Sequence, residues 1–296
     1  MITINSYTTV KRRARVPQDV FAHYWRDVHG PLCARLPGLG HYVQYHFDRN
    51  QDAHLWPLLE GIDEIPDYEL DGMVEIGFAS AADQQRFQDA SPLLFVDEQN
   101  MFAETLAYDL PEGSRALLNR LYDARYNGPD HLDRLQIHLA PRGDLADLNR
   151  YLLEDFGPWL ARQEPVLKVR LHPCAPFEND GQHPPSPGVA HRATAARERL
   201  AMLEIAFASP LARRRFLDSA AFQATEAAQV RHIAQLKAFA VSGVYTYVHE
   251  GELTTAALRG SRAAELIDYL GAANQLQPRV AALLFSGELD QPAQQP

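Results

Sequence analysis

One stretch organises the chain, and it reads Tyr24-Trp25-Arg26-Asp27-Val28-His29-Gly30-Pro31-Leu32. Phe21 and Trp25 precede His29 at steps of four residues, which share one face of an α-helix. The pattern predicts a helix that begins near Pro17, points His29 inward and breaks at Gly30-Pro31. Because an imidazole titrates near neutral pH, His29 is the best single candidate for proton chemistry. The alternative is a core histidine whose ring only makes a hydrogen bond.

The composition is that of a globular protein without a nucleic-acid or membrane partner. Of the 296 residues, 46% are hydrophobic and 22% charged, and the net charge of −10 disfavours binding to nucleic acid or to an anionic membrane. No apolar run approaches the roughly 20 residues of a membrane span, and we expect no signal peptide. Cys33 and Cys174 are the only cysteines, without a zinc-binding spacing. We therefore expect a reducing, cytoplasmic location and no metal site.

Residue patterns in the first half predict an α+β unit. Strands are expected over residues 1–11, 39–47, 73–78 and 100–108, and helices over 17–36 and 81–88. The order is β-α-β-β-α-β, the ferredoxin-like unit.

The second half repeats this pattern. Residues 73–80, MVEIGFAS, match residues 202–209, MLEIAFAS, at an offset of 129. Gly30-Pro31 matches Gly157-Pro158 at an offset of 127. Two blocks in the same order predict a tandem duplication. We divide the chain into a first unit with the site (1–125), a second, degenerate unit (126–253), and a tail (254–296) that packs on the core or forms an oligomer contact. Residues 263–270 of the tail are expected to be helical, and residues 290–296 to fray.

Three motifs of the first half carry a family resemblance. They are Tyr24-Trp25-x-x-x-His29-Gly30-Pro31, then Leu36-Pro37-Gly38-Leu39 followed by Tyr42-x-Gln44, then Asp71-Gly72-x-x-Glu75. With these motifs, most of residues 1–110 resembles the EthD family of dimeric α+β barrel proteins. In that family two protomers pair their sheets into a barrel, so the resemblance implies that two tandem ferredoxin-like units form this barrel within one chain.

The resemblance also has implications for ligands. It implies a small, mostly apolar or aromatic ligand bound between the sheet and the helices. Relatives with this barrel include cofactor-free polyketide cyclases, monooxygenases, dehydratases and decarboxylases, and also haem enzymes. The resemblance therefore indicates the fold more narrowly than the reaction.

The duplication provides an internal control for the site. His29 aligns with Phe156 at the offset of 127, so the same helical position holds an ionisable ring in one half and an apolar ring in the other. A position that only closes the core is satisfied by phenylalanine. The fold does not require His29, and we predict one site, in the first unit.

The strand after this helix also indicates a site in the first unit. Val169 and Leu171 of the second half align with Tyr42 and Gln44 of the first, and His46 is the next residue on that face. If the apolar pair faces the helices, the three polar side chains face them too, where His29 points. Mostly apolar walls with a few polar groups are typical of a ligand pocket. A register slip of one residue would move these side chains to the other face.

Glu75 has a counterpart, Glu204, in the half that lacks the histidine. A residue present in both halves is more simply structural. We expect Glu75 to pair with an arginine across the interface between the halves.

These residues favour an enzyme without a bound cofactor. We expect a lyase-type reaction, namely dehydration, decarboxylation or cyclisation, on a small aromatic or polycyclic ligand. The predicted catalytic residues are His29, His46 and Tyr42, and the predicted substrate-binding residues are Tyr24, Trp25, Gln44 and Phe21. Two alternatives stay open, which are a haem protein with His29 as the iron ligand and a non-catalytic carrier of an apolar molecule. The tail is compatible with a homodimer.

Overall fold

The computed structural model describes residues 1–50, 55–121, 125–181 and 183–287. Its first half contains strands β1 (Ile4–Arg12), β2 (Leu39–Phe47), β4 (Gly72–Phe78) and β5 (Phe102–Asp109), in the sheet order β5-β1-β4-β2. Between β1 and β2 lie α1 (Gln18–Tyr24), the π-helical turn η1 (Trp25–His29) and α2 (Gly30–Ala34). Helices α3 (Ala81–Ala90) and α4 (Pro92–Met101) connect β4 to β5.

The second half has the same order of elements. Strands β8 (Asp133–Pro141), β9 (Val166–His172), β10 (Ala201–Phe207) and β11 (Ile233–His249) are arranged as β11-β8-β10-β9. Between β8 and β9 lie α5 (Leu145–Arg150), the π-helical turn η2 (Tyr151–Phe156) and α6 (Gly157–Ala161). Helices α7 (Pro210–Leu217), α8 (Ala220–Gln223) and α9 (Glu226–His232) precede β11. The predicted α+β class is confirmed, and the origin by duplication stays a prediction.

The two sheets exchange strands and are continuous. The long strand β11 pairs with β8 through Ala240 and with β2 of the first half from Val241 onward. Conversely, β6 (Arg115–Asn119) pairs with β9 of the second half. The short strands β3 (Asp63–Glu64), β7 (Asn127–Pro129) and β12 (Glu252–Leu253) all pair with β11. The predicted boundary at residue 125 therefore does not separate the two sheets.

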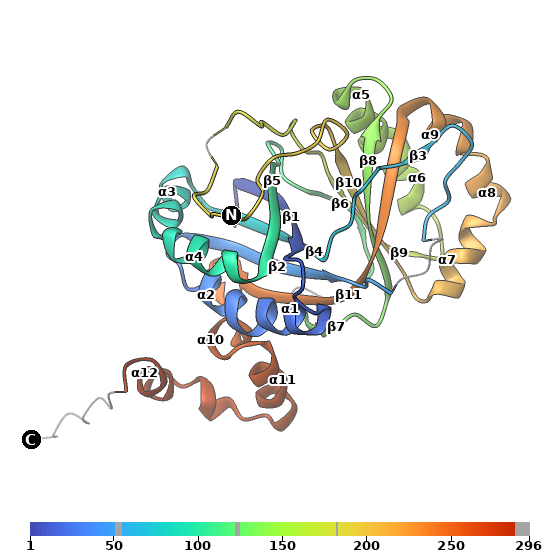
Figure 1. The fold of residues 1–296 in the computed structure, drawn as a ribbon. Coiled ribbons are helices and arrows are strands. Elements are labelled where there is room, and N and C mark those ends of the chain that lie inside the picture. Colours follow the sequence, from blue (N-terminus) through green and yellow to red (C-terminus); the bar gives the residue numbers. More distant parts are fainter. Residues whose placement is uncertain (51–54, 122–124, 182, 288–296) are drawn as a thin grey trace, which may run out of the picture.

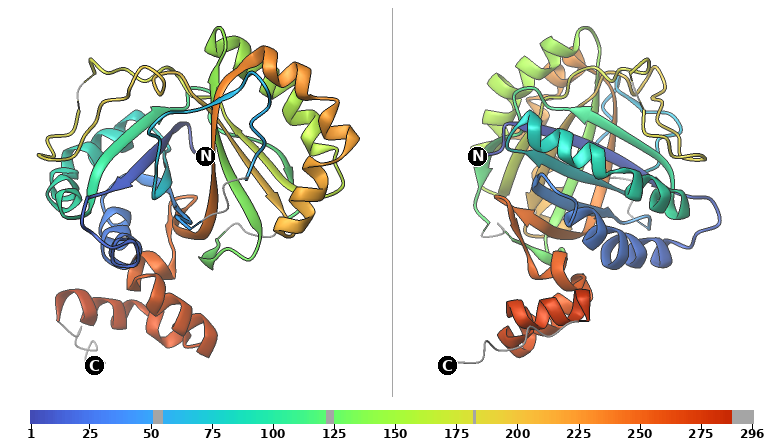
Figure 2. Two further views of the ribbon diagram at one scale, coloured as in Figure 1. Left: turned by 45° about the vertical axis from the view of Figure 1, so that its right-hand side comes forward. Right: turned by 90° about the vertical axis from the view of Figure 1, so that its left-hand side faces the viewer.

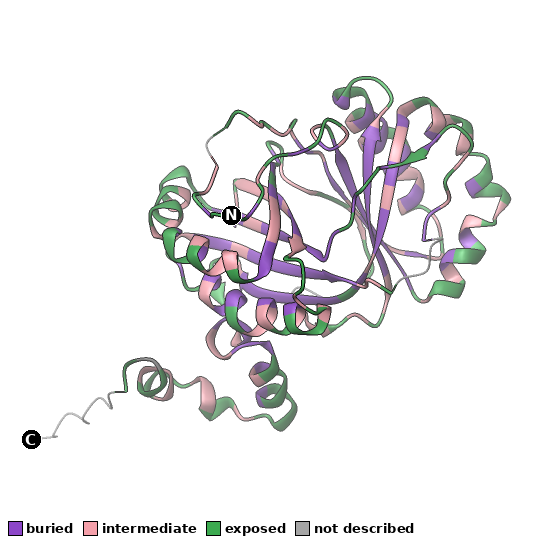
Figure 3. Cartoon of the chain, viewed as in Figure 1, coloured by how far each residue is buried: buried purple, intermediate pink, exposed green. Residues whose placement is uncertain are grey.

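The sheets pack face to face, with the helices outside (Figure 2). One apolar cluster joins Tyr45 and Met73 of the first sheet to Met202 and Phe239 of the second. There are two further clusters, one between each sheet and its own helices. Burial follows this layering, because the strands are buried and the outer helix faces are exposed (Figure 3). Each strand thus has one face toward the barrel interior and one toward helices.

The predicted helix break at Gly30-Pro31 is wrong. Gly30 has helical backbone angles (φ −55°, ψ −53°), and the helix continues through α2. In a regular α-helix the Pro31 ring would clash with the carbonyl four residues earlier. The π-helical turn avoids this, since the Gly30 N–H bonds to the carbonyl of Trp25, five residues back. Gly157 and Leu152 repeat the arrangement in the second half.

Helix α4 is a second departure from the expected elements. The residue pattern predicted a helix over 81–88, a strand from residue 100 and no helix between them, whereas α4 extends to Met101 and β5 begins at Phe102. Pro92 lies in the first turn of α4, where its missing N–H has no cost. This helix contributes Phe95, Asp97 and Glu98 to the site described below.

The tail forms α10 (Thr255–Arg259), α11 (Ser261–Leu270), the 3₁₀ turn η3 (Ala273–Leu276) and α12 (Pro278–Ser286). The predicted helix over 263–270 is confirmed. Helix α10 packs on α2 and β11, and α11 contacts η1 and β7, whereas η3 and α12 extend away from the body (Figure 1). The expectation for residues 290–296 lies outside the described residues. Among the described helices, none is long and apolar enough to cross a membrane.

Candidate functional site

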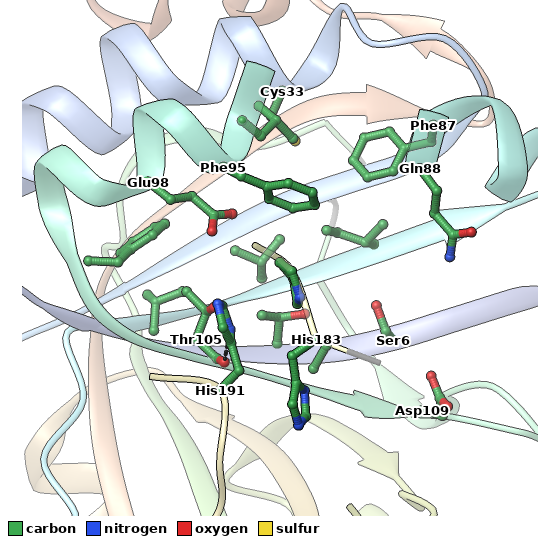
Figure 4. Close-up of a pocket in the computed structure, with 18 of the residues that line it drawn as sticks. Ser6, Cys33, Phe87, Gln88, Phe95, Glu98, Thr105, Asp109, His183 and His191 are labelled. Atoms are coloured by element: carbon green, nitrogen blue, oxygen red, sulfur yellow. Dashed lines mark hydrogen bonds between the residues drawn. The ribbon is translucent and has the colours of Figure 1, made fainter. Parts of the chain in front are cut away.

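A cavity of about 560 Å³ lies between the first sheet and its helices. A long loop of the second half completes the lining of the cavity. This loop approaches the edge strand β5 through residues 189–191. Figure 4 shows polar and aromatic side chains from these elements directed into it. The lining includes Ser6, Thr8, Trp25, His29, Cys33, Tyr42, Phe87, Gln88, Phe95, Glu98, Phe102, Thr105, Asp109, Phe177, Glu178, His183 and His191.

The matching space of the second half is filled by aromatic rings. Phe156, the counterpart of His29, stacks on Trp159 with ring centroids 5.9 Å apart. Phe216 and Phe222 continue the cluster, in which Trp56 from the first half also packs. The cavity lies against the sheet and helices of the unit that carries His29, a loop of the second half completes its lining, and a single site in the first unit stays a prediction.

His29 lies in the cavity wall because of the π-helical turn. Its side chain comes from the last residue of η1, and only 5% of its surface is exposed. The next residue is Gly30, and the ring of Tyr247 lies against the helix at this position. A Cβ added to Gly30 would come within 2.5 Å of that ring, which explains why a glycine follows His29. The hydroxyl of Tyr247 donates to the carbonyl of Arg26 at 2.6 Å. The glycine and this hydrogen bond hold η1 against β11.

Asp97 of α4 is the partner of His29. The Nδ1 atom of His29 lies 2.8 Å from one carboxylate oxygen of Asp97, and the hydroxyl of Tyr24 donates to the other oxygen. Burial raises the pKa of Asp97, but the hydrogen bonds from His29 and Tyr24 outweigh it, so this pKa is lowered overall. Among the described residues no side chain or backbone group is bonded to Nε2 of His29. Asp97 therefore orients the ring, and Nε2 is left for a ligand.

Glu98 follows Asp97 but points into the cavity (Figure 4). The one hydrogen bond to its carboxyl group within the described part of the chain comes from the hydroxyl of Ser186, at 3.4 Å. Burial raises the pKa of Glu98, and the nearby His29 only partly offsets this. The pKa of Asp97 is thus lowered and the pKa of Glu98 is raised, although the two residues are adjacent in the chain.

The predicted site residues divide into two groups. His29, Trp25 and Tyr42 line the cavity. Phe21, Tyr24, Gln44 and His46 do not contribute to the lining. Tyr24 instead holds Asp97, and Phe21 packs against Trp25 at 5.6 Å between ring centroids.

The expected convergence of Gln44 and His46 on the cavity needs correction. Both face the helices, as the strand register predicted, since the Gln44 amide donates to the carbonyl of Trp25 at 3.1 Å. However, the indole of Trp25 stacks on His46, with ring centroids 4.3 Å apart, and covers it. Burial lowers the pKa of His46 to about 3, so this ring is neutral. Gln44 and His46 belong to a closed network behind Trp25 that also includes Tyr42.

Comparison with known families matches part of the chain. The model of the EthD domain matches residues 13–104. Residues 13–104 are therefore similar to an EthD domain. This EthD-like region includes His29, Asp97 and Glu98, but neither the loop that closes the cavity nor the second half.

No curated protein matches the chain in sequence. Among solved structures, a provisionally assigned monooxygenase from Lactobacillus acidophilus NCFM has a TM-score of 0.45 and 8% identity, covering 84% of this chain and 98% of that one. A second provisionally assigned monooxygenase, from Fusobacterium nucleatum, has a TM-score of 0.48 and 7% identity, and the match covers 85% of this chain and 96% of that one. An anthrone oxidase-like protein has a TM-score of 0.49 and 9% identity, and the match again covers 85% of this chain and 96% of that one. Similarity this low gives no information on the activity of this chain.

Sequence patterns did not indicate Asp97 and Glu98 of α4, or the loop residues His183 and His191. The two acidic residues lie in the stretch PLLFVDEQNM of α4. Leu93 and Val96 of this stretch are apolar but exposed, so its apolar residues do not follow the spacing of a helix with one buried face. The loop residues come from the other half of the chain, and no local pattern indicates where a loop packs.

A second polar cluster lies in the barrel interior. Glu75 of β4 accepts from Arg170 of β9 at 2.5 Å, which confirms the expected pairing across the halves. Glu75, His172 and Glu204 have ligand atoms within 4.8 Å of one another, a spacing that a metal ion could use. Basic side chains already neutralise the two carboxylates, so we assign the cluster a structural role. These cations are Arg170 on Glu75, and Arg134 and Lys168 on Glu204.

Proposed function

We propose that this protein is a lyase-type enzyme that acts on a small aromatic ligand by proton transfer and without a bound cofactor. One observation supports this most directly, namely the pair of His29 and Asp97 in the wall of the cavity. A histidine held by a carboxylate at one ring nitrogen and open at the other is the arrangement of a general base. The second half has Phe156 at this position and aromatic rings in place of the cavity.

The chemistry follows from the two ring nitrogens. With the Nδ1 proton donated to Asp97, the lone pair of His29 is on Nε2. That atom takes a proton from a carbon next to a carbonyl or hydroxyl group of the ligand and returns it later. Phe87, Phe95 and Phe102 supply apolar walls for an aromatic ring. Tyr42, which also lines the cavity, would orient a ligand oxygen.

His29→Phe tests the proposal. Neutral hydroxylated aromatic compounds are screened for those that raise the melting temperature, and the absorbance of each is then followed during incubation with the protein. We expect turnover to fall by about 10²- to 10⁴-fold in the variant, because the general base is gone. Phe is the residue at the matching position of the second half, which makes it the conservative choice for the fold. Full turnover by His29→Phe would contradict the proposal.

The same pair favours one other function, a haem protein. Metal-bound histidines usually donate their second ring N–H to a carboxylate or carbonyl, as His29 can to Asp97. Haem iron would be held through Nε2 of His29. An absorption spectrum of protein from cells supplied with iron and haem precursor distinguishes the two. A Soret band that is lost in His29→Phe would replace the proposal of cofactor-free proton transfer.

A carrier without activity is the remaining alternative. It predicts ligands that raise the melting temperature of the purified protein and are never converted. The cytoplasmic location and a homodimer through the tail also remain proposals. For the dimer, the relevant observation is that Leu266, Tyr269 and Leu270 of α11 are exposed.

A further inference from the structure

Apart from the histidines His29, His183 and His191, the groups of the described cavity lining that can carry charge at neutral pH are acidic. Among the described lining residues there is no lysine or arginine, while Glu98, Asp109 and Glu178 contribute carboxyl groups. Burial raises the pKa of Asp109, and the charge of Glu178 adds to this. An anionic ligand would find no lysine or arginine to bind, and each of the three carboxyl groups would repel it when ionised. The lining therefore favours an uncharged ligand over a carboxylate or phosphate.

Glu98 differs from the other acidic groups by its position. Helix α4 directs Asp97 onto the ring of His29 and Glu98 into the cavity next to it (Figure 4). No ion pair of Glu98 occurs within the described part of the chain, and its hydrogen bond from Ser186 is long, at 3.4 Å. A carboxyl group that is enclosed and lacks a cation is favoured in its neutral, proton-donating form. The raised pKa of Glu98 agrees with this.

We propose that Glu98 is a second catalytic residue, a general acid that works with His29 to eliminate water from an uncharged aromatic ligand. This rests on the proposed function, which it narrows to dehydration. Decarboxylation becomes the less favoured reaction, because its substrate would bring a carboxylate to an acidic cavity.

The step balances without an oxidant or other reactant. Nε2 of His29 takes a proton from a ligand carbon, and the electron pair of that C–H bond becomes a C=C bond. The C–O bond on the adjacent carbon breaks, and its electron pair leaves with the oxygen. The carboxyl proton of Glu98 goes to this oxygen, which departs as water. The proton on His29 then returns to Glu98 through solvent, and both residues regain their first state.

A binding experiment tests the charge argument without a known substrate. The probes are 2-naphthol, which is neutral, and 2-naphthoate, which has the same rings and a negative charge. Binding to the wild-type protein and to Glu98→Gln is measured by titration calorimetry between pH 5.5 and 8. The lining histidines His29, His183 and His191 lose positive charge in both proteins as the pH rises, whereas Glu98 gains negative charge only in the wild type, so we expect the binding of 2-naphthoate to weaken more steeply with pH in the wild-type protein than in Glu98→Gln. The same decline in both proteins would overturn the assignment of Glu98.

Turnover measurements then separate this proposal from the proposed function. On a substrate found by the screen above, Glu98→Gln is expected to lower kcat by about 10²-fold or more and to remove the fall in rate that accompanies ionisation of Glu98 as the pH rises. If His29→Phe is inactive and Glu98→Gln keeps its kcat and pH profile, Glu98 is not an acid catalyst, and the proposed function stands. If both variants keep full activity, both proposals fail.

Two controls keep the result interpretable. Glu154→Gln makes the same charge change on an exposed helical position of the second half, and it should bind both probes as the wild type does. Glu98→Asp retains the acid and should recover part of the pH-dependent discrimination. Thermal unfolding of each variant identifies a loss of fold, in which case Glu98→Asp alone decides.

Discussion

His29 and Asp97 are 68 residues apart, and their pairing shows what residue-level reasoning can and cannot reach. The inward direction of His29 and Trp25 follows from helical spacing, and the direction of Tyr42 follows from strand alternation. Both were predicted. Asp97 was not, because its partner lies in a separate helix and only the packing of α4 on η1 brings the two together. The covering of His46 by Trp25 is likewise a matter of side-chain packing, which alternation does not describe.

Replacing Asp97 by asparagine tests whether the carboxylate orients His29. The amide has nearly the same shape, so the fold is expected to persist. It can, however, donate to Nδ1 and stabilise the wrong tautomer, with the proton on Nε2. We expect turnover to fall by roughly 10³-fold or more, as when the carboxylate of a hydrolase triad is replaced. The control is Asp89→Asn, on the exposed face of α3. Wild-type turnover in Asp97→Asn would mean that His29 acts without the carboxylate.

At the scale of elements, the Gly-Pro pairs decide how the first helix of each half is built. The sequence predicted a break, since proline normally ends a helix. A π-helical turn instead accommodates Pro31 and Pro158. It brings His29 to the cavity in one half and Phe156 to the core in the other. A sequence pattern shows that a proline is unusual in a helix, but not whether the helix ends or widens.

Gly30→Ala tests the close contact behind this turn. The new methyl group would overlap the ring of Tyr247, which cannot move freely because its hydroxyl is bonded to Arg26. Overpacking of this kind costs about 1–3 kcal/mol in the free energy of unfolding, as measured in urea. Gly143→Ala is the matched control, because a Cβ added to Gly143 would have no neighbouring atom within 4 Å. Equal stability of the two variants would contradict the argument.

At the scale of the whole molecule, the order of strands in each half was predictable and the way the halves join was not. Local periodicity marked the β-α-β-β-α-β pattern twice. The exchange of β11 and β6 between the sheets depends on hydrogen bonds to distant strands, and no local signal records them. The barrel interior that results contains charged groups, which the apolar strand patterns did not indicate beyond the Glu75 pairing.

These buried charges make the stability of the barrel depend on pH. Burial raises the pKa of Glu204, but Lys168 and Arg134 more than compensate and lower it to about 2. A carboxyl whose pKa is lowered by folding stabilises the native state above its unfolded pKa of about 4.3, and this contribution is lost as the pH falls toward 2. The shift corresponds to about 3 kcal/mol.

Glu204→Gln isolates this contribution. The variant is expected to be less stable than the wild type at pH 6, because Arg134 and Lys168 lose a buried charged partner. As the pH falls to 2.5, the wild type loses the stabilisation by Glu204 and the variant has none to lose, so the difference between them should shrink by about 2–3 kcal/mol. Urea unfolding at each pH measures it, and Glu154→Gln, on an exposed position, should show no such change. A difference that stays constant from pH 6 to 2.5 would mean that Glu204 is not held ionised by its cations, and that the barrel interior owes its stability to packing alone.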